Sequence, residues 1–533
     1  MQIAQVLISQ IFALFFALSF NIAFCSRHVL GFVFMLKCCK VVIYLDTVGQ
    51  ECGNSVEFWI MTQKISKEHQ DTQVPQAPQA QAQAKKTLVK DLTSGGVARQ
   101  LVVFALPLFL SNALQAVYNM VDMIIVGQFI GGAGMSAVSI GGDVLHLLTF
   151  VAMGFSSAGQ VLIARSVGAG RMDKVKDIIG NLFTLLTAAS ILISVVCFGL
   201  RRPILDLLNT PEQSYKFAMD YMVTCVVGLV FIYGYNVVSA ILRGMGDSKR
   251  PFIFVGIAAV LNLVLDYIFV VIFRMQVFGA ALATVIGQAV SFIGSVVYLF
   301  VRRDVFGFDF RLRSFAPKVD VLRPIVTLGV PMAIQSAAVN FSKVLLTAWI
   351  NLEGVVFSAL AGVYNKINTM AAVLSQSFTT AGATMVGQNL GAGKNARVPR
   401  VLATIALIML SFFTLLSLLL LIFPSQVYAM FTSDLAVLSL SHILTLPMIL
   451  NFYGAGTRSI AFALINGSGN TKLNLAVALI DGIFMRIGLA AFLCFALGLG
   501  SYGCWLGDAI AGFAPLLIGC AFFLSGKWKN PVK

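Results

Sequence analysis

The chain alternates long apolar stretches with short polar breaks. Residues 178–200 and 401–423 each run for about 23 residues without a charged side chain, which is enough for a helix to cross a hydrocarbon layer of roughly 30 Å. Because a backbone in lipid must satisfy its own hydrogen bonds, the pattern predicts an all-α membrane protein. It predicts twelve spanning helices, near 101–127, 135–163, 178–200, 217–242, 252–273, 277–301, 325–350, 355–386, 401–423, 437–465, 473–497 and 502–525.

The second half of the chain repeats the first at an offset of about 223 residues. Three landmarks recur in the same order, which indicates a duplicated unit of six helices. An even number of spans lets both units sit the same way up, so the repeat is parallel. The landmarks are ALPLFL around Pro107 and GVPMAI around Pro331, ARSVGAGR (164–171) and GQNLGAGK (387–394), and ILRGMGDSK (241–249) and LINGSGNTK (464–472).

The repeat also predicts the domain organisation: an extension at 1–60, a polar cytoplasmic tail at 61–100, an N-lobe at 101–303, a linker at 304–323, a C-lobe at 324–526 and a short cytoplasmic end at 527–533. Residues 1–60 resemble neither unit and hold four of the nine cysteines. The apolar run 6–24 is either a signal-like segment or an extra helix. The alternative is that Met61 is the true start and that residues 1–60 are translated upstream sequence.

Composition agrees with a membrane protein, since 58% of the residues are hydrophobic, 11% are charged and the mean hydropathy is +0.89. A net charge of +15 could suggest nucleic acid, but the basic residues crowd alternate loops. That alternation is the positive-inside pattern, which predicts a cytoplasmic membrane location with both termini in the cytoplasm. The basic residues are Arg171, Lys174, Lys176, Arg243, Lys249, Arg250, Arg302, Arg303, Arg311, Arg313, Lys318, Lys394, Arg397, Arg400, Lys472, Lys527, Lys529 and Lys533.

Ionisable residues inside spans are functional candidates. Counting residues from the helix ends puts Asp122, Asp266 and Thr284 roughly 10 Å below the outer surface. Asn262 precedes Asp266 by one turn, and Tyr118 precedes Asp122 by one turn. These groups predict an oxygen-rich, acidic pocket, which suits either a proton shared between carboxylates or a hard cation such as Na⁺. The alternative is that the two carboxylates only hydrogen-bond helices together.

The C-lobe does not repeat these two carboxylates, although Thr284 has a polar counterpart in Asp508. Lys343 matches Asp508 in depth, and Arg458 matches Asp481. We therefore expect two structural ion pairs that neutralise charge inside this lobe.

A second group of polar residues consists of candidates for lining a central cavity. It contains Asp143, Lys366, Lys343, Gln335 and Asn340. His146 is more simply explained as a packed histidine.

The glycine-rich segments do not indicate an enzyme. Gly168–Gly170 and Gly391–Gly393 are expected to form tight turns at helix ends, where glycine tolerates positive φ. The segment 244–249 lacks the spacing of a phosphate-binding loop. No nucleophile–base pair, metal-ligand spacing or cofactor loop is present, so we expect a transporter with no cofactor apart from a coupling ion.

The segment FALPLFLSNALQAVYNMVDMIIVGQFIG (104–131), the two GAG loops and RGMGDSKRP (243–251) resemble the MATE family, the multidrug and toxic compound extrusion transporters. The resemblance covers residues 91–526 and implies that family's two-lobe fold, shared with the MOP superfamily. The DinF-like branch has an acidic residue in helix 1, N-x-x-x-D in helix 5 and Thr in helix 6. The matching residues are Asp122, Asn262, Asp266 and Thr284, with Tyr118 one turn before the first.

The resemblance implies an antiporter that exchanges cationic or amphipathic organic compounds for H⁺ or Na⁺ by alternating access. The family's other branch uses a carboxylate in helices 7 and 10, where this chain has only Gln335 and Asn340 in helix 7, which disfavours that mechanism. We expect a monomer in membrane lipid that handles small organic cations and no nucleic acid. The alternative is a lipid-linked oligosaccharide flippase, for which Lys343 and Lys366 would have to supply basic groups.

Overall fold

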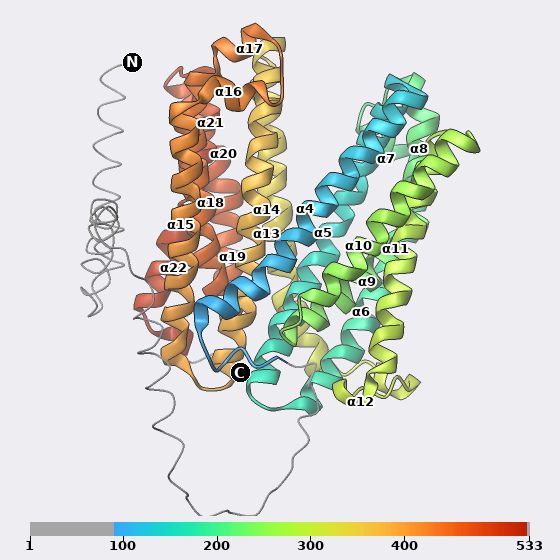
Figure 1. Cartoon of the computed structure of the whole chain (residues 1–533), viewed down its shortest axis with the longest axis vertical. Coiled ribbons are helices and arrows are strands. Elements are labelled where there is room, and N and C mark those ends of the chain that lie inside the picture. Colours follow the sequence, from blue (N-terminus) through green and yellow to red (C-terminus); the bar gives the residue numbers. More distant parts are fainter. Residues whose placement is uncertain (1–89, 530–533) are drawn as a thin grey trace, which may run out of the picture. The chain divides into compact units, whose positions relative to one another are not determined.

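The computed structural model describes residues 90–529, which contain helices and no strand (Figure 1). The first six predicted spans correspond to α4 (Val97–Ile130), α5 (Gly132–Gly168), α6 (Met172–Gly199), α8 (Glu212–Val227) with α9 (Leu229–Gly244), α10 (Lys249–Asp266) with the π-helix η1 (Tyr267–Ile272), and α11 (Gln276–Val301). The last six correspond to α13 (Val319–Asn351), α14 (Val355–Gly391), α15 (Val398–Ile422), α18 (Thr445–Ser468), the α19 (Thr471–Leu479), η5 (Ile480–Met485), α20 (Arg486–Ala491) and η6 (Phe492–Ala496) series, and α21 (Gly500–Ala511) with α22 (Ala514–Leu524). Short helices connect them: α7 (Arg201–Leu207), α12 (Arg303–Phe306), η2 (Leu312–Phe315), η3 (Asn395–Arg397), α16 (Pro424–Ala429), α17 (Leu435–Ser439), η4 (Ser441–Leu444) and η7 (Lys527–Lys529).

The two predicted six-helix lobes are present. Within the described residues, ten helical stretches are long and apolar enough to span a membrane, and α8 and α9, which meet at a bend of 47°, make an eleventh. The twelfth predicted span is α14, a helix of 37 residues that carries polar side chains such as Asn365, Lys366 and Asn368. Its repeat counterpart α5 is also 37 residues long. The predicted all-α, two-lobe membrane fold is therefore confirmed.

The first helix of each lobe begins against the other lobe. Leu101 and Phe104 in the first turns of α4 belong to a buried cluster made mainly of C-lobe residues. In the same way, Leu328 and Met332 of α13 pack against α5 of the N-lobe. Figure 1 shows α4 running from beneath the C-lobe helices up into the N-lobe. This exchange fastens the two bundles together near the starts of both helices.

The segments just before these two helices follow the same exchange. Before α4, the Leu92 amide donates to Gln388 Oε1 (3.0 Å) in the C-lobe. Before α13, the Lys318 amide donates to Asn181 Oδ1 (2.7 Å) in the N-lobe. Each lead-in segment therefore hydrogen-bonds to the opposite lobe.

The two GAG loops meet at one end of the molecule, which we call the basic end because the linker with Arg302, Arg311 and Arg313 also lies there. As predicted, glycines in these loops adopt positive φ, namely Gly170 (69°) and Gly393 (70°). The preceding glycines have another role, because each approaches the opposite lobe. A Cβ at Gly168 would lie 2.0 Å from the Gln388 carbonyl oxygen, and one at Gly391 would lie 2.1 Å from that of Arg165.

The lobes are closed at the basic end and diverge toward the opposite end, where α7, α8, α16 and α17 lie (Figure 1). Hydrogen bonds between lobes occur in the half near the basic end. Gln160 Nε2 donates to Thr384 Oγ1 (2.7 Å), and Arg165 Nη1 donates to the Ser468 carbonyl (3.5 Å). We call the contacts around Gln160, Gly168 and Gly391 the basic-end seal.

Candidate functional site

A cavity of about 420 Å³ lies inside the N-lobe. Side chains of α4, α5, α8, α9, α10 and α11 form its wall, and Gln376 and Thr380 of α14 border it from the C-lobe. The wall is mixed in polarity, with Asn, Gln, Ser and Tyr side chains beside Leu, Met and Val. Three of the five predicted coupling residues line this cavity, namely Tyr118, Asp122 and Thr284.

The other two coupling residues lie directly behind the wall. Asp266 is fully buried and Asn262 is 3% exposed, while Asp122 is 7% exposed. Asp266 is the last residue of α10, and the π-helix η1 begins immediately after it. It lies within electrostatic range of Asp122. The structure therefore brings the predicted acidic group together from α4, α10 and α11.

The oxygens of this acidic group lack donors. Within the described residues, Asp122 Oδ1, both carboxylate oxygens of Asp266 and Asn262 Oδ1 are buried without a hydrogen-bond partner. Asn262 Nδ2 donates to Thr284 Oγ1 (3.4 Å), and that hydroxyl donates to the Ala280 carbonyl (3.1 Å). Buried carboxylates without a donor or a counter-charge are strongly unfavourable. A proton or a cation is the species that would satisfy these four oxygens.

A small void adjoins the Asn262 and Thr284 side chains of this group. A void of about 10 Å³ is bordered by Tyr118, Asn262, Thr284 and Gln288. Gly287 allows the helices to come this close, since a Cβ there would lie 3.2 Å from the Ala258 carbonyl oxygen. The void is about the size that one water molecule needs. It therefore suits a species no larger than a water molecule or a small cation.

The predicted cavity candidates separate into two groups. Asp143 lines the cavity, as does His146, whose ring also packs edge-on against Phe150 at 4.7 Å between centroids. The remaining candidates do not border this cavity, and they are Lys343, Lys366, Gln335 and Asn340.

These four residues of the C-lobe have other surroundings. Lys366 is exposed on α14 and Lys343 is half-buried. Asn340 is exposed, and its Nδ2 donates to the Ser336 carbonyl (2.8 Å). Gln335 is buried, and its Nε2 has no partner among the described residues.

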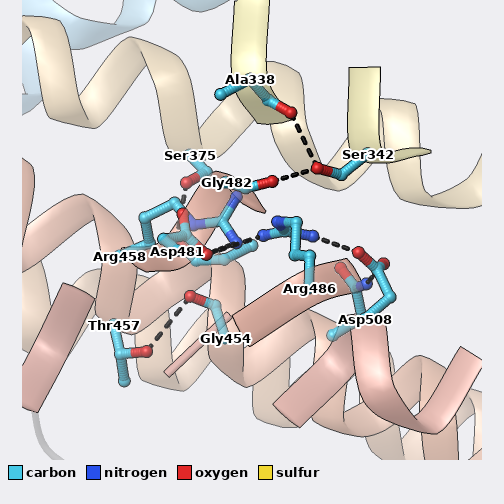
Figure 2. A network of polar contacts seen from close by, with 12 residues as sticks. Ala338, Ser342, Ser375, Gly454, Thr457, Arg458, Asp481, Gly482, Arg486 and Asp508 are labelled. Carbon is cyan, nitrogen blue, oxygen red and sulfur yellow. Dashed lines mark hydrogen bonds and ion pairs between the residues drawn. The ribbon is translucent and has the colours of Figure 1, made fainter. Parts of the chain in front are cut away.

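The C-lobe contains a buried network of opposite charges (Figure 2). Arg486 donates to Asp508 and, through Nη2, to Asp481 Oδ1 (3.2 Å). Arg458 Nη2 lies 3.6 Å from the same Asp481 oxygen, so the expected Arg458–Asp481 pair is present. The expected Lys343–Asp508 ion pair does not form among the described residues. Asp508 is paired with Arg486 instead.

Arg486 was missed because sequence reading assumed an α-helix. In an α-helix, residues five apart point in different directions. Residues 480–485 instead form a π-helix, whose wider turn brings Asp481 and Arg486 onto one face. The sequence did contain one signal, because an arginine inside the apolar stretch 473–497 needs a buried partner. In the structure this residue, Arg486, is 1% exposed.

Arg243 was also misplaced by sequence reading, which counted it among the basic loop residues. The structure puts it on the cavity wall, where its Nε donates to Gln160 Oε1 (3.0 Å). The sequence assigns neither Arg243 nor Gln160 to a site. Because these two residues come from different helices, no spacing rule pairs them.

A model of the MatE family matches residues 107–268 and 331–492. Similar relatives include the probable multidrug resistance protein YpnP of Bacillus subtilis, 30% identical over 58% of this chain and 68% of its own length. The probable multidrug resistance protein NorM of Thermotoga maritima is 26% identical over 81% of this chain and 94% of its own. The FAD transporter of Shewanella oneidensis is 26% identical over 83% of this chain and 97% of its own.

Solved structures share the fold. A multidrug resistance MATE family transporter of the MOP superfamily, described in an outward-facing conformation, superposes with a TM-score of 0.75 at 22% identity. The superposition covers 84% of this chain and 99% of that transporter's chain. A MOP superfamily transporter from Pyrococcus furiosus gives the same TM-score, identity and coverage.

Proposed function

The chain belongs to the MATE family of membrane transporters, and from this premise we propose that it exports amphipathic organic cations in exchange for H⁺ or Na⁺. In this proposal the basic end faces the cytoplasm, as the positive-inside pattern predicts. The divergence of the lobes at the opposite end then corresponds to a state open to the outside. The relatives named as multidrug resistance proteins support small organic substrates.

One observation carries the proposal: buried, donor-free carboxylates adjoin a cavity large enough for a small organic molecule. Asp122 is part of both the carboxylate group and the cavity wall, since one of its oxygens lacks a donor and its side chain lines the cavity. A coupling ion and a cationic drug would therefore compete for the same negative charge. Such competition is what exchange requires.

The mechanism follows from this competition. An ion or proton that occupies Asp122 and Asp266 removes the negative charge that attracts the drug. To release drug a hundredfold more readily in one state than in the other, the site needs a difference of about 2.7 kcal/mol. Loss of a charge–charge interaction in a low-dielectric site is of that order. Alternation of access then requires the basic-end seal to open when the outer ends close.

The donor set supports H⁺ and Na⁺ equally. Carboxylate, amide and hydroxyl oxygens are hard ligands suited to Na⁺, and two adjacent carboxylates readily share one proton. The gradient that accelerates efflux identifies which of the two ions the site exchanges.

A lipid-linked oligosaccharide flippase is less well supported. A diphosphate carrier requires several basic groups around its path, and the two lysines considered for this role, Lys343 and Lys366, do not border the cavity. Asp122 and Asp143, which do border it, would repel such a carrier.

The test is ethidium efflux from energised vesicles under an imposed proton or sodium gradient. We expect one gradient to accelerate efflux by the wild-type chain. We expect Asp122→Asn and Asp266→Asn to lose about tenfold or more of that acceleration, because the ion has lost its carboxylate. The control is Asp320→Asn, an exposed carboxylate at the start of α13 that makes no ion pair among the described residues. Normal gradient-driven efflux by both cavity variants would overturn the proposal.

A further inference from the structure

Arg243 is the one arginine or lysine on the wall of the N-lobe cavity as far as the structure describes the chain. It lies in the last turn of α9, near the basic-end seal, whereas Asp122 lies in the half of α4 nearer the opposite end. Its neighbour Gly244 packs closely on α5, since a Cβ there would lie 2.8 Å from the Gln160 carbonyl oxygen. This close packing fixes the backbone from which the guanidinium enters the cavity.

The guanidinium has no counter-charge. Among residues 90–529, no carboxylate lies within ion-pair distance of Arg243, and its one hydrogen bond is from Nε to Gln160. Two arginines of the C-lobe spans provide a contrast, because Arg458 and Arg486 are both paired with aspartates. Arginine carries five N–H donors in a planar fork that fits a carboxylate. Since only the Nε–H of Arg243 is used, its other four N–H donors are available to a ligand.

We propose that Arg243 forms an anion subsite at the floor of the cavity, which binds the carboxylate of amphoteric substrates while their cationic group lies toward Asp122 and Asp143. The inference rests on the proposed function and adds a second point of recognition to it. A wall that is acidic near one end and basic at the other favours a ligand with both charges over a simple cation. A charge-assisted, bidentate contact is about twice as strong as a neutral hydrogen bond.

The subsite also touches the basic-end seal. Gln160 accepts from Arg243 through Oε1 and donates through Nε2 to Thr384 of the C-lobe (2.7 Å). A carboxylate on Arg243 would therefore lie one residue away from the contact that joins the lobes. Gln376 of the C-lobe borders the cavity as well, and its side-chain amide can donate to the ligand.

The experiment uses two dyes that differ by one group. Rhodamine 110 carries a carboxylate and a delocalised cation, and rhodamine 123 is its methyl ester and carries the cation alone. Binding of each dye to the purified full chain is measured by fluorescence polarisation at neutral pH without any gradient. The variants are Arg243→Gln and Arg243→Lys. The matched control is Arg302→Gln, an exposed arginine outside the cavity.

We expect Arg243→Gln to weaken rhodamine 110 about tenfold or more and rhodamine 123 by less than about threefold. Arg243→Lys should recover part of the loss, because an ammonium keeps the charge without the planar fork. Equal weakening of both dyes, or no weakening of rhodamine 110, overturns the anion subsite and leaves the proposed function intact. A wild-type chain that binds neither dye contradicts the proposed function and, with it, this inference.

Discussion

In the N-lobe, the polar site in the half away from the basic end holds two carboxylates and, among the described residues, no arginine or lysine, whereas the corresponding region of the C-lobe holds an aspartate and an arginine that neutralise each other. The family matches begin at residues 107 and 331 and end at residues 268 and 492, which gives an offset of 224. Under that offset Asn262, which donates to Thr284, corresponds to Arg486, which donates to Asp508. The corresponding residues, N-lobe first, are Tyr118 and Ser342, Asp122 and Leu346, Asn262 and Arg486, Asp266 and Ala490, and Thr284 and Asp508.

The difference shows how a duplicated fold can separate two tasks. Charges that satisfy each other inside the protein hold helices in place and have no need of an external ion. Carboxylates without a partner need a species from outside, so their environment changes when that species arrives or leaves. The C-lobe site is therefore suited to rigidity and the N-lobe site to exchange.

The largest expected effect is on stability and belongs to the C-lobe. Arg486→Leu leaves Asp481 and Asp508 with much of their charge unpaired, and we expect a loss of about 3–5 kcal/mol in the free energy of unfolding. Thermal unfolding of the purified protein in detergent measures it. The double change Arg486→Leu with Asp508→Leu removes both members and should recover much of the loss. A single variant as stable as the wild type would show that the network does not hold the lobe together.

The second prediction puts the C-lobe arginine into the N-lobe. Asn262→Arg places a guanidinium beside Asp122 and Asp266, which supplies them with an internal counter-charge. We expect gradient-driven efflux to fall about tenfold or more, because the coupling ion is no longer needed there. The unfolding temperature serves as the control and should stay near that of the wild type. Undiminished coupling in the folded Asn262→Arg variant would refute the division of tasks.

A smaller effect is expected at the basic-end seal, where the lobes are alike. Gly168→Ala and Gly391→Ala each put a Cβ about 2 Å from a backbone oxygen of the other lobe, so each should shift the population toward separated basic ends to a similar degree. Spin labels at Lys174→Cys and Arg400→Cys report the distance between lobes. Gly170→Ala serves as the comparison variant, because a Cβ at Gly170 would have no atom of the other lobe within 4 Å. A shift for one lobe's glycine alone would show that the seal is also asymmetric.

The smallest effect concerns the lead-in segment before α4. Partial burial opposes ionisation of Asp91, but hydrogen bonds from Ser94 and Thr93 outweigh it and hold the pKa of this carboxyl below its ordinary value. The stabilisation of the lead-in segment by the ionised Asp91 carboxylate is therefore present at neutral pH. It is lost as the pH falls through the lowered pKa, below about pH 4. At neutral pH, Asp91→Asn should speed hydrogen exchange slightly at residues 92–95 and leave residues 314–318 unchanged. Equal exchange in variant and wild type would mean that Asp91 does not order the segment.

Much of the fold could be predicted because its signals are local and repeated. Uncharged apolar stretches of membrane-spanning length and the recurrence of Pro107 and Pro331 were enough for the spans and lobes. The grouping of Asp122, Asn262 and Asp266 followed from α-helical spacing, and the structure does bring these side chains together.

Other features depend on geometry that spacing does not contain. The Asp481–Arg486 contact needs a π-helix, and the close approach at Gly168 and Gly391 needs the docked lobes. The contact of Arg243 with Gln160 joins two helices far apart in sequence. None of these has a period that a single helix pattern would reveal.

The most direct test of the central claim is ion release upon drug binding. Ethidium is added to the purified chain in weakly buffered detergent solution, and released protons or displaced radioactive sodium are counted. The account predicts release from the wild-type chain and from the C-lobe variant Arg486→Leu with Asp508→Leu, and almost none from Asp122→Asn with Asp266→Asn. Full release from the variant without N-lobe carboxylates, or its loss when only the C-lobe pair is removed, would contradict it.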